Sequence, residues 1–144
     1  MKKTYCRHDE QESLLKSELR EFVAGLSSGE TLATYLLRLM GEKGLSAPQV
    51  YHRAELDRQI FNKLIQLRQP GRASKQTLLQ VSIGIMATEQ EAEKLLATCG
   101  FIFELNSNND RAFLFCLRKG EYDMVAVWEA KEMLDRDAGN HKSM

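Results

Sequence analysis

The sequence lacks the features that mark membrane proteins and secreted disulfide-bonded domains. Its 144 residues include two prolines and three cysteines, and its apolar runs are only a few residues long. A membrane-spanning helix needs about 20 consecutive apolar residues, so we expect no transmembrane segment. The polar start, MKKTYCRHDEQES, has no apolar stretch of the kind found in signal peptides. We therefore expect a cytoplasmic protein.

The residues that bind metals and carry out catalysis are scattered along the chain. The three cysteines are odd in number and, like the three histidines, do not cluster, which predicts neither a disulfide framework nor a metal site. The sequence has no Gly-rich phosphate loop, no Ser/His/Asp signature and no HExxH motif. We expect a protein that is not an enzyme and that uses no cofactor.

The apolar pattern predicts an all-α fold. Apolar residues recur at three- and four-residue spacing almost throughout, and no useful length alternates between apolar and polar residues. Ser46 and Ser74 are expected N-caps, residues 88–91 have the form of a capping box, and Asp110 is the expected cap of a later helix. The tail from residue 135 is expected to fray. The predicted helices span residues 11–26, 31–43, 47–54, 57–69, 74–86, 88–100, 110–119 and 122–134.

The formal net charge is zero, but the charge is unevenly distributed. Residues 1–50 carry seven basic and seven acidic side chains, and residues 51–76 carry six basic and two acidic ones, a net charge of +4. Residues 77–144 carry seven basic and eleven acidic side chains, a net charge of −4. Because the local field decides whether a phosphate backbone is attracted, residues 51–76 are a candidate nucleic-acid surface.

The predicted helix over residues 57–69 separates its side chains by type. Ile60, Phe61, Leu64 and Leu67 fall on one face. The other face has no carboxylate after Asp57 and consists of cations and amides, namely Arg58, Gln59, Asn62, Lys63, Gln66 and Gln69. These groups can hydrogen-bond to base edges and to phosphates, although an ordinary solvent-exposed helix face can also be cationic.

The two short helices predicted before residue 70 favour DNA binding over the alternative that the polar face is an ordinary solvent-exposed surface. Two short helices joined by a tight turn form a helix-turn-helix, and the second one lies in the major groove. The expected base-contacting residues are Arg58, Gln59, Asn62 and Lys63. The expected phosphate-contacting residues are Arg68, Arg72 and Lys75.

Residues 31–100 resemble the Xre, or lambda-repressor-like, helix-turn-helix family. The resemblance rests on the run Glu42-Lys43-Gly44-Leu45-Ser46, on Phe61 as the core position of the recognition helix, and on the entry to the next helix at Ser74. The runs DRQIFNK, EKLLATCGF and YDM also resemble bacterial proteins that add two C-terminal helices to such a domain. Where the family usually has a bracing glutamine, this chain has Ala47.

The resemblance implies a five-helix domain over residues 30–100, preceded by an amphipathic helix in residues 1–29 and followed by a helical extension, residues 101–144, packed on it. It implies a bacterial transcriptional regulator that binds specific double-stranded DNA. The last two helices, which carry Trp128, are a candidate homodimer surface. The alternative is an antitoxin-like or phage-defence accessory module that does not read DNA and binds a protein partner through its acidic C-terminal half.

Overall fold

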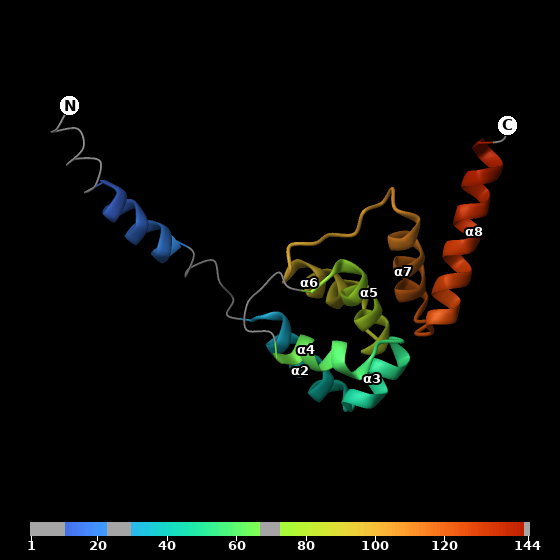
Figure 1. Cartoon of the computed structure of the whole chain (residues 1–144), viewed down its shortest axis with the longest axis horizontal. Coiled ribbons are helices and arrows are strands. Elements are labelled where there is room, and N and C mark those ends of the chain that lie inside the picture. Colours follow the sequence, from blue (N-terminus) through green and yellow to red (C-terminus); the bar gives the residue numbers. More distant parts are fainter. Residues whose placement is uncertain (1–10, 23–29, 67–72, 143–144) are drawn as a thin grey trace. The chain divides into compact units, whose positions relative to one another are not determined.

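The computed structural model describes residues 11–22, 30–66 and 73–142, with side chains up to residue 139, and all regular structure in these ranges is α-helical. The all-α prediction is confirmed for this part of the chain. Contacts between residues divide the chain into two units, residues 1–30 and 31–144. The helices of the second unit (Figure 1) are α2 (Leu32–Lys43), α3 (Ala47–Arg53), α4 (Arg58–Gln66), α5 (Lys75–Gly84), α6 (Glu89–Ala97), α7 (Asn108–Lys119) and α8 (Met124–Lys142).

The first unit contributes one described helix, residues 11–22. Its sequence is amphipathic, and its large apolar side chains are between 57% and 63% exposed: Leu14, Leu15, Leu19 and Phe22. The predicted continuation of this helix to residue 26 lies outside the described residues. None of the described helices is both long enough and apolar enough to cross a membrane.

Side-chain caps start α3 and α6 where the sequence predicts them. The Ser46 hydroxyl accepts a hydrogen bond from the Gln49 amide while the Gln49 side chain accepts one from the Ser46 amide, which is a capping box. Thr88 and Glu91 repeat this arrangement at the start of α6. Gly44 ends α2 with φ of 65°, in the left-handed region that favours glycine.

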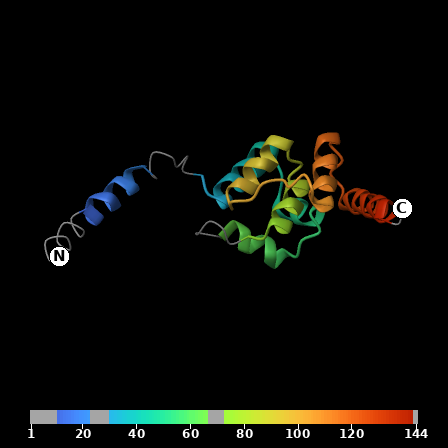
Figure 2. The same ribbon diagram turned by 90° about the horizontal axis from the view of Figure 1, so that it is seen from above.

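The core of the second unit is formed by α2 to α7 and the start of α8, where Met124 and Val127 are buried in it. Helix α2 packs on α4, α3 packs on α5, and α5 packs on α6. Helix α5 is buried on several sides, as its almost wholly apolar sequence predicts. Figures 1 and 2 both show α7 and α8 together at one end of the unit, and α7 also contacts α5 and α6.

Helices α3 and α5 approach each other closely at Gly84. A Cβ atom placed on Gly84 would lie 2.5 Å from the Val50 carbonyl oxygen and 3.0 Å from the Ala54 Cβ. The same region is bridged by the Arg53 guanidinium, which donates to the Gly84 carbonyl oxygen at 2.7 Å. Gln80 donates to the Ala54 carbonyl oxygen at 2.9 Å. Glycine at residue 84 therefore determines how near α3 can lie to α5.

Helices α2 and α6 are joined by a half-buried ion pair. The Lys43 ammonium lies 2.8 Å from a Glu91 carboxylate oxygen and donates to the Met86 carbonyl oxygen at 2.8 Å. Burial alone would raise the pKa of Glu91, but the hydrogen bonds from Lys43 and from the Thr88 amide outweigh it and hold that pKa below its ordinary value.

Two predicted boundaries in the C-terminal part are wrong. The N-cap of α7 is Ser107, whose hydroxyl accepts from the Asp110 amide, whereas Asp110 lies in the first turn and accepts the Glu104 amide at 2.7 Å. Helix α8 continues to Lys142, through the residues that the sequence predicts to fray. In α8, ion pairs at four-residue spacing join Lys131 to Asp135 and Arg136 to Glu132, which favours the longer helix.

Gly84→Ala should lower the free energy of unfolding by about 1–3 kcal/mol, because the new methyl group overpacks the contact between α3 and α5. Gly41→Ala is the matched control, because a Cβ on that α2 glycine meets nothing within 4 Å. It should raise stability by about 0.5–1 kcal/mol. Urea titrations followed by circular dichroism measure both values, and an equal effect of the two variants would contradict the close approach.

Glu91→Gln should lower the melting temperature at neutral pH, and the difference from the wild type should shrink as the pH falls. The folded-state pKa of Glu91 is lowered, so its carboxylate stabilises the fold above the ordinary value of 4.5 and loses this effect as the pH falls through the folded value. Glu93→Gln, on an exposed residue of the same helix, is the control. A difference that stays constant down to about pH 3, below the ordinary range of glutamate, would refute the pairing of Lys43 with Glu91.

Candidate nucleic-acid interface

Helices α3 and α4 are joined by a tight turn, residues 54–57. The Ala54 amide donates to the Val50 carbonyl oxygen at 2.9 Å and the Leu56 amide donates to the Tyr51 carbonyl oxygen at 2.9 Å, so the turn is held to α3. Asp57 then caps α4, because one of its carboxylate oxygens accepts the Gln59 amide at 3.1 Å. The chain therefore changes direction between the helices within this short turn.

Two buried side chains fix the rotation of α4 about its axis. Phe61 and Leu64 are at most 3% exposed, and the Phe61 ring centroid lies 5.9 Å from that of Tyr51 on α3. The sequence predicts that both residues lie in the core, and both are buried. Because successive residues are separated by about 100° around a helix, burial of these two directs the polar side chains of α4 away from the core.

The polar side chains of α4 face solvent. Arg58, Gln59 and Lys63 are exposed and Asn62 is half-buried. In the described ranges, none of these four side chains has a hydrogen-bond or ion-pair partner. The structure therefore brings the four predicted base-contacting residues together on one exposed surface that extends from the first turn of α4 to its middle.

Ile60 departs from the prediction that it shares the core face of α4. Its side chain is 44% exposed. The arc of α4 that contacts the core is centred on Phe61, and Ile65 packs at its other edge, so Ile60 lies at the boundary next to Lys63. The spacing of apolar residues along the sequence does not show how wide the buried arc is.

Lys75 does not lie free beside α4. Its ammonium is 2.5 Å from an Asp110 carboxylate oxygen and 3.3 Å from Glu104, and its side chain is 19% exposed. Asp110 is itself buried at the start of α7. The positive charge of Lys75 is therefore neutralised inside the fold, which leaves it poorly placed for the predicted phosphate contact. The other two predicted phosphate contacts, Arg68 and Arg72, lie outside the described residues.

The local excess of basic residues is smaller on the surface than in the sequence. Arg53 donates to the Gly84 carbonyl oxygen, and Lys75 is paired with carboxylates. Among the described part of residues 51–76, the exposed cations without such partners are Arg58 and Lys63. The cationic surface is therefore concentrated on α4 itself.

A contact with α8 holds the turn between α3 and α4. Glu55 adopts a left-handed conformation with φ of 55°, which is uncommon for a residue other than glycine, asparagine or aspartate. Its carboxylate accepts the Trp128 indole N–H at 3.1 Å, and the Trp128 ring packs edge-on against Phe113 of α7 at 6.1 Å between centroids. No pattern in the sequence indicates that Glu55 contacts Trp128. Ala47, at the start of α3, is half-buried against the core.

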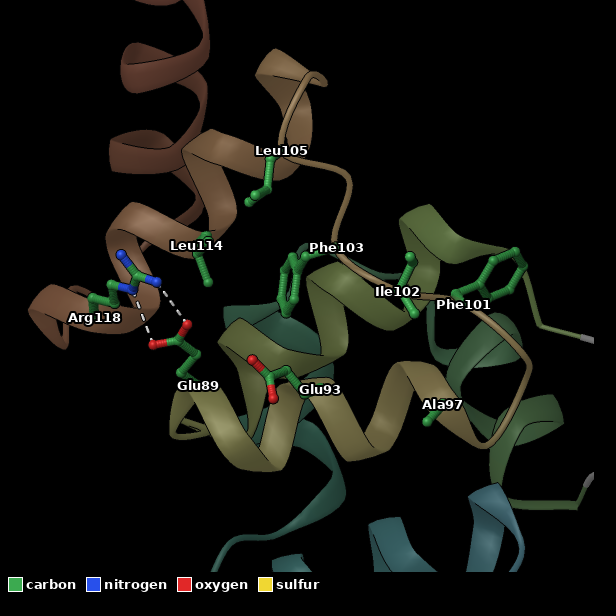
Figure 3. A pocket seen from close by; sticks show the side chains of 9 residues that line it. All are labelled: Glu89, Glu93, Ala97, Phe101, Ile102, Phe103, Leu105, Leu114 and Arg118. Atoms are coloured by element: carbon green, nitrogen blue, oxygen red, sulfur yellow. Dashed lines mark hydrogen bonds and ion pairs between the residues drawn. The ribbon is translucent and has the colours of Figure 1, made fainter.

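A separate, mostly apolar hollow of about 370 Å³ lies between α6, α7 and residues 101–105. Figure 3 shows the Arg118–Glu89 ion pair at one end of it, Phe101 at the other and Phe103 between them. Hydrogen bonding from Arg118 lowers the pKa of Glu89. The lining has no nucleophile beside a base, and no group of three His, Cys, Asp or Glu residues in the described ranges could hold a metal ion.

Comparison with known proteins identifies no relative of the chain. No protein-family model, no curated protein and no solved structure matches it. Its function is therefore inferred from its own residues and from their arrangement.

Lys75→Gln should lower the free energy of unfolding by about 1.5–3 kcal/mol, because it leaves the buried Asp110 carboxylate without its cation. Lys63→Gln removes the same charge from an exposed position and should change stability by less than about 0.5 kcal/mol. Thermal and urea unfolding measure both. Equal, small effects would show that Lys75 is a surface cation after all.

Proposed function

We propose that this protein binds double-stranded DNA as a bacterial transcriptional regulator, with α3 and α4 as a helix-turn-helix and α4 as the recognition helix. One observation carries the proposal: the exposed side of α4 presents Arg58, Gln59, Asn62 and Lys63, without a carboxylate and without partners in the described ranges. The short connection to α3 and the burial of Phe61 support the proposal, because a recognition helix must be held rigidly to its scaffold.

The chemistry of these side chains suits the major groove. The groove is about 12 Å wide, which admits a helix about 10–12 Å in diameter. Arginine and lysine can donate to guanine, whereas glutamine and asparagine can pair in two-bond fashion with adenine. We therefore assign base contacts to Arg58, Gln59, Asn62 and Lys63. The only carboxylate near this surface, within the described ranges of α4 and its cap, is that of Asp57, which accepts an amide at the positive end of the helix.

Phosphate contacts are assigned to Arg68 and Arg72, which follow α4 in the sequence. Lys75 is left out because its charge is taken up by Asp110. We further propose that the protein acts in the cytoplasm and binds as a homodimer, since dimeric helix-turn-helix proteins contact two half-sites about one DNA turn apart.

The alternative is a protein-interaction module of the same scaffold. One observation favours it: Phe115 of α7 and Met133 of α8 are exposed and line an apolar groove of about 340 Å³ between these helices. This groove lies in the acidic part of the chain, residues 77–144, which would be poorly suited to DNA. The two functions can be separated by the salt dependence of DNA binding.

Gln substitution of both Arg68 and Arg72, the residues assigned to phosphate contacts, should weaken binding to duplex DNA and reduce the slope of log affinity against log salt by about 1 for each phosphate that is no longer neutralised. Fluorescence anisotropy with duplexes selected by the wild type from a random pool, at two salt concentrations, measures this. Gln substitution of both Lys119 and Arg136, which removes the same charge from α7 and α8, is the control and should leave the slope unchanged.

In the same assay, Gln59→Ala and Asn62→Ala should each reduce the preference for selected over scrambled duplexes by about 1–3 kcal/mol. Absent or salt-insensitive binding of the wild type at micromolar concentration would overturn the proposal and favour the interaction module.

A further inference from the structure

Ile60 stands out on the exposed side of α4 as an apolar side chain among hydrogen-bonding ones. It is 44% exposed, it follows Arg58 and Gln59 in the first turn, and it lies one turn before Lys63. Its neighbour Phe61, by contrast, is fully buried. The fold therefore presents Ile60 at the edge of the surface assigned above to base contacts.

An isoleucine that is exposed on a helix contributes little to the stability of the fold. A β-branched side chain loses rotamer freedom in a helix, and its apolar surface gains nothing from water. It can form no hydrogen bond, so it cannot read a donor or an acceptor on a base. The one apolar group that base pairs present in the major groove is the C5-methyl group of thymine.

We propose that Ile60 reads thymine, by packing its side chain against the C5-methyl group of a thymine next to the bases contacted by Gln59 and Lys63. The inference rests on the proposed function of α4 and adds the identity of one base to it. Successive residues of the first turn then supply a guanidinium, an amide and an apolar surface, and each of these matches a different feature of the groove.

The surroundings of Ile60 favour DNA over a protein partner. A protein-binding patch needs several adjoining apolar side chains. The other exposed or half-exposed side chains on the outward side of α4, within its described residues, are cations and amides, namely Arg58, Gln59, Asn62, Lys63 and Gln66. An apolar partner surface would remove water from these groups without offering them hydrogen-bond partners, which costs free energy.

The test compares duplexes that differ only in the methyl group. Duplexes selected by the wild-type chain from a random pool are synthesised again with deoxyuridine in place of thymidine, one position at a time. At the position read by Ile60, the wild type should bind the deoxyuridine duplex about four-fold more weakly, which is the effect of one buried methyl group. Ile60→Ala should bind the two duplexes equally well.

Leu37→Ala is the matched control, because Leu37 is a comparably exposed apolar side chain, 48% exposed, on α2. It should retain the four-fold discrimination. If Ile60→Ala unfolds, Ile60→Gln takes its place, because glutamine is a good helix former at an exposed position and has no methyl group to pack against thymine. It should bind the two duplexes equally well.

The possible results distinguish a failure of the Ile60 assignment from a failure of the DNA-binding proposal. If the wild type selects no duplex, the DNA-binding proposal itself fails. If duplexes are selected but no thymine position discriminates, or if Ile60→Ala discriminates as well as the wild type, the assignment to Ile60 is overturned while DNA binding stands. Loss of self-association in Ile60→Ala with unchanged discrimination would place Ile60 in a protein contact instead.

Discussion

The burial of Phe61 and Leu64 is the constraint on which the rest of the candidate interface depends. These two side chains pack α4 against the core, where α4 contacts α2 and α3. This packing determines which side of α4 faces outward. The polar residues at 58, 59, 62 and 63 face solvent because the helix has only one orientation that buries both apolar anchors. The close approach of α3 to α5 at Gly84 then fixes α3, and the turn at residues 54–57 fixes α4 relative to it.

Charges in this protein serve two different purposes. Lys43, Arg53 and Lys75 join helices to one another through carboxylates or carbonyl oxygens. Such cations stabilise the packing and are not available to a ligand. Arg58 and Lys63 make no such contacts in the described ranges. Counting basic residues along the sequence therefore overstates the cationic surface, and the surface that remains coincides with the polar side of α4.

Local signals in the sequence were enough to predict most of the helices. Ser46, Ser74 and Thr88 act on amides within three residues, so their caps can be predicted without knowledge of the fold. What depends on distant residues could not be predicted. Lys75 meets Asp110, and Glu55 meets Trp128 across 73 positions, and neither pairing leaves a periodic signal. The exposure of Ile60 depends on how much of α4 the core covers, which is also a tertiary property.

Amide chemical shifts of the isotope-labelled protein, recorded while a selected duplex is added at low and at high salt, show which helix meets DNA. If α4 does, the largest changes should fall on residues 58–63 and on the preceding turn, they should diminish at high salt, and α8 beyond Trp128 should change little. Changes concentrated on α7 and α8, with α4 unaffected, would rule out α4 as the DNA-binding surface.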